Sequence, residues 1–231
     1  MEIIYEDDDV LVVDKPAGIV VFPENKISEK TLIDYLFKIY PNLKNVGKSP
    51  RYGIVHRLDK NTSGILLVAK NNKTLNFLQN QFQTGKVFKK YLALVVGNLK
   101  QNQGIIETLI GRSPGDRRKQ KVYLPGEPDS QEKRKAVTEY KVLQKFENYT
   151  LIEVEPKTGR KHQIRTHLAY LGHPISGDKL YEFKGQICPK GLKRQFLHAN
   201  YLKIELPSGE IKAFESELPE DLRKVVLKIK N

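Results

Sequence analysis

Residues 53–70 read GIVHRLDKNTSGILLVAK, and this stretch joins the densest polar cluster of the chain to its clearest apolar run. The run at residues 64–70 is continuous and of strand length, which predicts a buried β-strand. The polar residues 56–63 come directly before it. Because a rigid strand fixes the loop attached to it, such a loop is a good place for reactive side chains. The stretch therefore predicts a buried strand with a candidate site at its start.

Asp59 is the carboxylate of this cluster, and His56, Arg57 and Lys60 lie close to it in sequence. Neighbouring cations favour the ionised form of a carboxylate. An ionised carboxylate in a basic setting can act as a nucleophile, act as a base, or form half of a structural ion pair. The residues alone leave these three roles open.

Strand patterns outnumber helical patterns along the chain. Helical spacing predicts helices over residues 29–40, 73–84, 160–171 and 219–229, the first capped by Ser28. Apolar runs predict strands over residues 10–16, 19–21, 64–70, 89–99, 104–111, 136–146 and 149–155, and a hairpin over 194–206 and 210–214. Strands that follow one another directly favour an α+β fold with a mixed, largely antiparallel sheet and flanking helices.

Two other polar regions are candidates for function. Residues 112–135 have the weakest pattern and carry many basic side chains, and a loop of this length is usually either functional or disordered. Residues 158–167 open the predicted helix 160–171. His162 and Arg165 fall on one flank of that helix, beside an apolar stripe. We expect this flank to lie at the edge of the core, where it can face a cleft.

The charge of the 231-residue chain favours a polyanionic partner. The formal net charge is +13, although residues 1–10 hold five acids and no bases. Each Lys or Arg that meets a phosphate releases counterions, so this surplus suits a nucleic acid, while a Lys-rich solvated surface is the alternative. No apolar run is long enough to span a membrane, and the N-terminus lacks a signal pattern. We therefore expect a cytoplasmic protein that is not bound to a membrane.

Metal and cofactor chemistry find little support in the sequence. One cysteine, Cys188, and five histidines are poor material for a metal site or a disulfide framework. His162 and His167 do not share a helical face as a zinc-binding pair would. The common phosphate-binding loops, the dinucleotide fingerprint, the nucleophile elbow and the H-E-x-x-H motif are absent from the sequence. We expect a reaction without cofactor or metal.

Five segments together resemble the RluA family of pseudouridine synthases, the branch that includes RluD-type enzymes. Residues 53–70 are similar to its central H-R-L-D-x-x-T-S/T-G signature. The other segments, in family order, are VVDKPAGIVV (12–21), KKYLALVVG (89–97), TGRKHQIRTHLAYLGHPISGDKLY (158–181) and RQFLHA (194–199). Lys161 replaces the usual Thr of G-R-T-H-Q-I-R. Many relatives carry an N-terminal S4 RNA-binding domain, and this chain begins directly with the segments of the catalytic domain.

The resemblance implies a fold and an activity. The fold is a bifurcated mixed sheet with flanking helices and two lobes around a central RNA-binding cleft, so residues 1–231 would form a single catalytic domain of two subdomains without a separate S4 domain. The activity is the isomerisation of specific uridines to pseudouridine in structured RNA, ribosomal or transfer. We expect the enzyme to act as a monomer.

The resemblance also implies residue roles. Asp59 matches the essential aspartate, Tyr91 the active-site tyrosine, and Arg165 the basic residue that pairs with the aspartate. Arg57 matches the arginine that fills the gap left by the flipped base. We expect RNA contacts from Arg57, His56, Thr62, Arg160, His162, Arg112, Arg117, Arg118 and Lys119.

The chemistry of the reaction suits these residue types. The N1–C1′ bond of uridine must break and C5 must bond to C1′, so Asp59 could attack C1′ or remove the 2′ proton, and both routes stay open. Arg165 would keep Asp59 ionised, and Tyr91 would place its ring against the base, with simple sheet packing as the alternative. The base must first leave the RNA stack, which costs a few kcal/mol.

Two other classes of protein fit the sequence less well. An RNA-binding module without activity needs no carboxylate in a basic groove, so Asp59, Tyr91 and Arg165 speak against it. A hydrolase of small nucleosides would need a second carboxylate or a water-activating group, and it would not need a net charge of +13.

Overall fold

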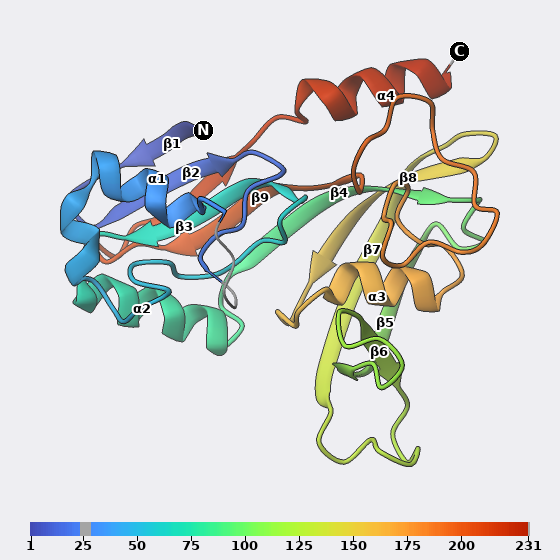
Figure 1. Ribbon diagram of the computed structural model, residues 1–231, viewed down its shortest axis with the longest axis horizontal. Helices are drawn as coiled ribbons and strands as arrows, with labels where there is room; N and C mark the ends of the chain where they lie inside the picture. The colour runs from blue at the N-terminus through green and yellow to red at the C-terminus, as the bar shows by residue number, and fades with distance from the viewer. Residues whose placement is uncertain (24–28, 231) are drawn as a thin grey trace. The chain divides into compact units, whose positions relative to one another are not determined.

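The computed structural model describes residues 1–23 and 29–230, which divide into two compact units. The first unit comprises Met1–Phe88 and Ala199–Glu217, and the second comprises Lys89–His198 and Leu218–Asn231. The boundary falls inside two strands, β4 (Phe88–Val96) and β9 (Leu197–Glu205), which are labelled in Figure 1. Each unit is therefore built from two separate stretches of the chain.

The first unit is built on the neighbouring strands β1 (Glu2–Glu6), β2 (Val10–Lys15), β3 (Ser63–Ala69) and β9, with β10 (Ile211–Glu215) paired to β9. The pairings β1–β2, β2–β3 and β9–β10 are antiparallel. The helices of this unit are α1 (Leu32–Ile39), the short 3-10 helix η1 (Pro41–Asn45) and α2 (Asn72–Gln83). All seven residues of β3 are buried, which confirms the strand predicted over residues 64–70.

The start of α1 differs from the prediction. The helix begins at Leu32, and the backbone N–H and hydroxyl of Thr31 both donate to Asp34 Oδ2 at 2.8 Å. The predicted cap, Ser28, lies outside the described residues. The strand predicted over residues 19–21 is wrong, because the carbonyls of Val20 and Val21 accept from Leu32 N and Ile33 N instead. These residues satisfy amide groups that the first turn of a helix leaves without intrahelical partners.

The second unit holds the strands β4, β8 (Tyr149–Pro156), β7 (Arg134–Lys145), β5 (Gln103–Arg112) and β6 (Gln120–Tyr123), in that order across the sheet. The pairings β4–β8, β7–β8, β5–β7 and β5–β6 are antiparallel. Helix α3 (Gln163–Tyr170) packs against β6, β7 and β8, and α4 (Glu220–Lys230) contributes Leu222 and Val225 to the core. The strands and helices of both units confirm an α+β fold that is largely antiparallel.

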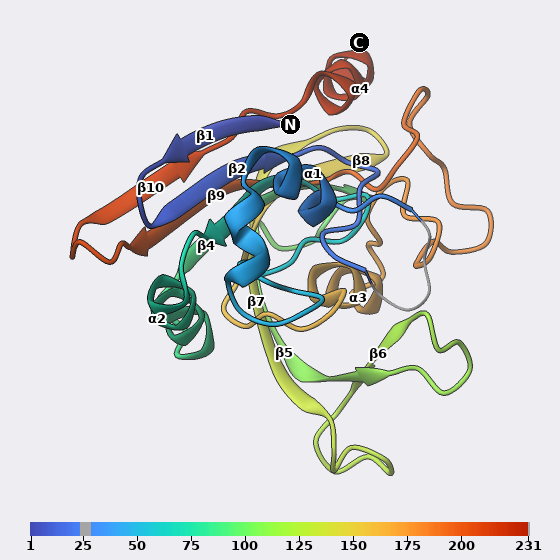
Figure 2. The same ribbon diagram turned by 60° about the vertical axis from the view of Figure 1, so that its left-hand side comes forward.

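The region 112–135 is more regular than its sequence suggested. Strand β5 extends to Arg112, β6 pairs with it from Gln120 to Tyr123, and β7 begins at Arg134, so two connections replace one long loop (Figure 2). The four residues of β6 are too few to give a clear alternating pattern. Helix α3 also begins later than predicted, at Gln163, and His162 precedes it with a left-handed φ of 55°.

Candidate active site

Asp59 opens a tight turn that leads into β3. Its carbonyl accepts from Thr62 N at 3.0 Å, and its side chain is half-buried. Leu58 and Thr62, on the two sides of the turn, are buried. The backbone around Asp59 is therefore fixed by packing and by a hydrogen bond, as a group that must meet a substrate in one orientation requires.

The side chain of Lys15 stabilises this turn through hydrogen bonds. Its ammonium group is fully buried at the end of β2 and donates to the carbonyls of Pro16, Ile19 and Lys60 at 2.8, 3.0 and 3.2 Å. The carbonyl of Lys60 also accepts from Gly18 N at 2.8 Å. Residues 15–18 (KPAG) therefore fix the position of Lys60, the residue directly after Asp59.

His56 and Arg57 are engaged with the fold of the first unit. Nε2 of His56 accepts from the backbone amide of Leu67 in β3 at 3.1 Å, and its ring stacks on Phe82 of α2 at 4.6 Å. The guanidinium of Arg57 lies over the ring of Phe22 at 5.5 Å. The accepting Nε2 places the proton of the neutral imidazole on Nδ1.

Gly64 must be a glycine because β3 approaches its neighbour closely there. Its φ is 116°, and a Cβ at this position would lie 2.2 Å from the carbonyl oxygen of Ala199. Any side chain would push β9 away from the strand that carries the Asp59 turn. This contact gives the glycine of the H-R-L-D-x-x-T-S-G signature a physical reason.

In the second unit, Tyr91 lies on β4 opposite Val154 of β8. Lys89 shares its face of the strand, and burial lowers the pKa of that ammonium to about 8, an effect that Glu155 opposes. A lysine with a lowered pKa on the same strand face as Tyr91 is a feature that strand periodicity does not reveal.

Arg165 is held by a carboxylate that the sequence reasoning did not single out. Its Nε and Nη2 donate to Oδ2 and Oδ1 of Asp178 at 2.6 and 2.8 Å. Arg165 is 6% exposed and Asp178 is 1% exposed, so the expectation that Arg165 lies at the edge of the core is wrong. The aspartate that ends the HPISGD stretch (173–178) was the sequence signal that could have identified Asp178 as the partner of Arg165. The expected pairing of Arg165 with Asp59 stays a prediction.

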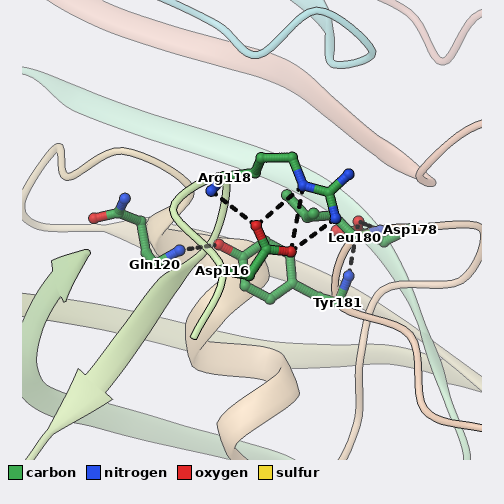
Figure 3. Close-up of polar contacts among 6 residues, drawn as sticks. All are labelled: Asp116, Arg118, Gln120, Asp178, Leu180 and Tyr181. Carbon is green, nitrogen blue, oxygen red and sulfur yellow. Dashed lines mark hydrogen bonds and ion pairs between the residues drawn. The ribbon is translucent and has the colours of Figure 1, made fainter. Parts of the chain in front are cut away.

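His162 and Arg165 both contact Tyr181. The guanidinium of Arg165 lies 5.0 Å from the centre of the Tyr181 ring, and Nδ1 of His162 lies 3.0 Å from the Tyr181 hydroxyl. The same hydroxyl accepts from the backbone amide of Gln120 at 2.7 Å, as Figure 3 shows. The structure therefore brings His162 and Arg165 together through a tyrosine, although His162 lies outside the helix.

The basic residues of the second unit that are expected to contact RNA differ in exposure and in bonding partners. Arg112, Arg117 and Arg118 are exposed, and Lys119 is half-buried. Arg118 binds the Asp116 carboxylate through Nε and Nη2, and this contact lowers the pKa of Asp116 to about 2. The pKa of Arg160 is lowered by burial and by the nearby charge of Arg134, and its Nε donates to the carbonyl of Lys135 at 2.9 Å.

The described part of the chain offers neither a cluster of metal ligands nor a helix that could span a membrane. Among residues 1–23 and 29–230, no three His, Cys, Asp or Glu side chains gather closely enough to hold a metal ion. Over the same residues, no helix has the length and apolar character needed to cross a bilayer.

The comparisons with known proteins agree on one family. Residues 9–170 match the family described as RNA pseudouridylate synthase. The chain belongs to this family. It is an RNA pseudouridine synthase of the RluA/RluD type, an enzyme that isomerises uridine to pseudouridine. Asp178 and Tyr181 lie beyond the matched residues.

Two relatives and one solved structure illustrate the similarity. The chain is 42% identical to an uncharacterized RNA pseudouridine synthase of Aquifex aeolicus over 97% of its own length and 72% of the relative. It is 41% identical to the ribosomal large subunit pseudouridine synthase D of Nitrosomonas europaea over 100% of its length and 66% of the relative. The structure of human RNA pseudouridylate synthase domain containing 4 aligns with a TM-score of 0.79 at 25% identity, covering 99% of this chain and 92% of that one. This pseudouridine synthase therefore spans about two thirds or more of each.

Proposed function

We propose that this pseudouridine synthase modifies specific uridines in structured RNA, with large-subunit ribosomal RNA as its substrate, and that Asp59 is its catalytic carboxylate. The names of several similar proteins, ribosomal large subunit pseudouridine synthase D, support the choice of RNA. The observation that carries the role of Asp59 is its turn, which Lys15, Thr62 and the buried strand β3 hold in place.

The chemistry assigns Asp59 to the ribose of the target nucleotide. Breaking the N1–C1′ bond leaves the sugar electron-poor, and an ionised carboxylate stabilises that state by attacking C1′ or by removing the 2′ proton. The half-buried setting of Asp59 suits either step, since a partly desolvated carboxylate interacts more strongly with developing positive charge than an exposed one.

Arg165 and Tyr91 complete the proposed catalytic set. In this proposal Arg165 keeps Asp59 ionised, while Asp178 fixes the plane of the guanidinium through two parallel hydrogen bonds. Tyr91 stacks on the uracil, and its hydroxyl helps to remove the C5 proton after the new carbon bond has formed.

RNA contacts are proposed in each of the two units. Arg57, with His56 and Thr62 beside it, would act next to the target nucleotide, and Arg57 would fill the gap that the flipped base leaves. Basic residues of the second unit would contact phosphates along the RNA. Of these, Arg112, Arg117 and Arg118 are exposed, and Lys119, Arg160 and His162 are half-buried. We expect a monomeric enzyme that works in the cytoplasm.

Substitution of Asp59 by Asn tests the proposal. The substrate is unmodified large-subunit ribosomal RNA transcribed in vitro with 5-tritiated uridine, because conversion releases the tritium. We expect no release with Asp59→Asn, with the melting temperature and RNA affinity close to wild type. Asp8→Asn makes the same charge change at an exposed position and should stay active. Release by Asp59→Asn within about tenfold of wild type would remove Asp59 from the catalytic role. Release only from transfer RNA transcripts would correct the substrate.

A further inference from the structure

Tyr181 joins three segments of the second unit at one side chain. Its ring lies under the guanidinium of Arg165 in α3, and its hydroxyl contacts His162, the residue before α3. That hydroxyl also accepts from the amide of Gln120, the first residue of β6. Tyr181 is only 7% exposed, so these contacts are tightly packed. In such packing a small shift of one segment displaces the others.

The hydroxyl of Tyr181 has polar contacts on more than one side. A phenol has one hydrogen to donate and lone pairs to accept with. The oxygen accepts from Gln120 N at 2.7 Å and lies 3.0 Å from His162 Nδ1, where the tautomer of the imidazole decides which of the two groups donates. One oxygen atom thus fixes the start of β6 relative to the start of α3.

The segment before Gln120 is a compact loop with its own internal bonds. Ser113 N donates to the carbonyl of Lys119 at 3.1 Å, and Lys119 N donates to the carbonyl of Asp116 at 2.9 Å. The Asp116 carboxylate also accepts from the backbone and the guanidinium of Arg118, as Figure 3 shows. A loop closed in this way is stiff. RNA bound at its exposed Arg117 and Arg118 would therefore displace Gln120 as well.

We propose that Tyr181 is a positioning residue that holds the Arg165–Asp178 pair in register with the basic loop Ser113–Lys119. Asp178 belongs to the same short turn as Tyr181, since its carboxylate accepts from Leu180 N at 3.1 Å. One turn therefore supplies the anion that orients Arg165, the ring beneath Arg165 and the tether to the loop. RNA seated on the loop would set the orientation of Arg165 through Tyr181. This inference rests on the proposed function, which gives Arg165 and the loop their roles.

Tyr181→Phe is the decisive variant, because it keeps the ring under Arg165 and removes the oxygen that reaches Gln120 and His162. Gln120→Pro removes the other end of the tether, since proline lacks the amide hydrogen and is tolerated at the first residue of a strand. Tyr123→Phe is the matched control. Tyr123 is a buried tyrosine of the same hairpin, and its hydroxyl donates to the carbonyl of Arg112 at 3.1 Å.

Two measurements decide the proposal. The first is the NMR signal of the Arg165 Nε–H group, recorded without RNA, which reports the setting of the guanidinium independently of activity. The second is the single-turnover rate of tritium release at saturating ribosomal RNA, together with RNA affinity. We expect Tyr181→Phe and Gln120→Pro to shift the Arg165 signal and to lower the rate by about tenfold to a hundredfold, with affinity little changed. The double variant should lose no more than Tyr181→Phe alone, because both changes break one contact.

The possible results separate this role from a merely structural one. An unchanged Arg165 signal and rate in Tyr181→Phe, even with a lower melting temperature, would overturn the proposal. An equal loss in Tyr123→Phe would also overturn it, because the effect would then come from a loosened hairpin. Should the wild-type enzyme convert neither ribosomal nor transfer RNA, the proposed substrate fails, and the Arg165 signal still decides whether Tyr181 positions the guanidinium.

Discussion

His167 makes the stability of the second unit depend on pH. This residue of α3 is fully buried, with Nδ1 2.8 Å from the hydroxyl of Thr138 in β7 and Nε2 3.0 Å from the hydroxyl of Thr108 in β5. A neutral imidazole suits two hydroxyl partners, because one ring nitrogen donates and the other accepts. Burial disfavours the imidazolium and lowers the pKa of His167 to about 4.

The pKa difference between the folded and unfolded chain sets the sign and the size of the effect. An unfolded histidine has a pKa of about 6.5. Between that value and the folded pKa of about 4, the unfolded state binds a proton that the folded state does not. The free energy of unfolding therefore falls as the pH falls through this window. Above the window, the stability contributed by the neutral His167 is fully present. From pH 7.5 to pH 5 the loss is about 2 kcal/mol.

The test compares wild type with His167→Gln by urea unfolding at several pH values from 7.5 to 5. Titrations elsewhere in the protein cancel in the difference between the two proteins. Glutamine cannot titrate, so the stability advantage of wild type should shrink by about 2 kcal/mol across the range. The control His173→Gln changes a half-buried histidine of the same unit. A wild-type advantage that stays constant with pH would show that His167 is not held neutral by burial.

Three substitutions test other contacts. Arg165→Ala should lower the free energy of unfolding by about 3–5 kcal/mol because it leaves Asp178 buried without its cation, and adding Asp178→Ala should recover part of that stability but no activity. Full stability in Arg165→Ala would contradict the buried pair. Tyr91→Phe should bind RNA normally and slow single-turnover conversion about a hundredfold or more, whereas wild-type speed would leave Tyr91 a packing role. Asp116→Asn should release Arg118 for phosphate and steepen the salt dependence of RNA affinity by about one phosphate contact, and an unchanged slope would exclude Arg118 from the interface.

The features that the sequence predicted well are those set by neighbouring residues. The run at residues 64–70 became the fully buried β3, since a continuous apolar stretch of that length is stable only when covered on both faces. The hairpin of β9 and β10 followed from its Pro-Ser-Gly turn. The position of Asp59 directly before β3 followed from the same stretch, and its role remains a proposal.

The features that escaped prediction depend on contacts between distant residues or on single backbone angles. The pairing of Arg165 with Asp178 joins residues 13 positions apart, and no periodic pattern links them. His162 leaves the helical pattern because its φ is positive, which the sequence does not encode in a recognisable way. Thr31 is the observed cap of α1 because its Asp34 partner sits three positions later, which completes a capping box.

The first unit is built from two stretches of the chain, and this has a consequence for synthesis on the ribosome. Strand β3 lies between β2 and β9, yet β9 is made only after residues 89–196 have been translated. Residues 53–55 already bond to Leu67 and Ala69 on this edge, so until β9 is made only the first part of the edge stays unpaired in the growing chain. An unpaired edge of a buried strand is a template for association with other chains. That part of the edge therefore stays open to other chains while nearly half of the protein is translated.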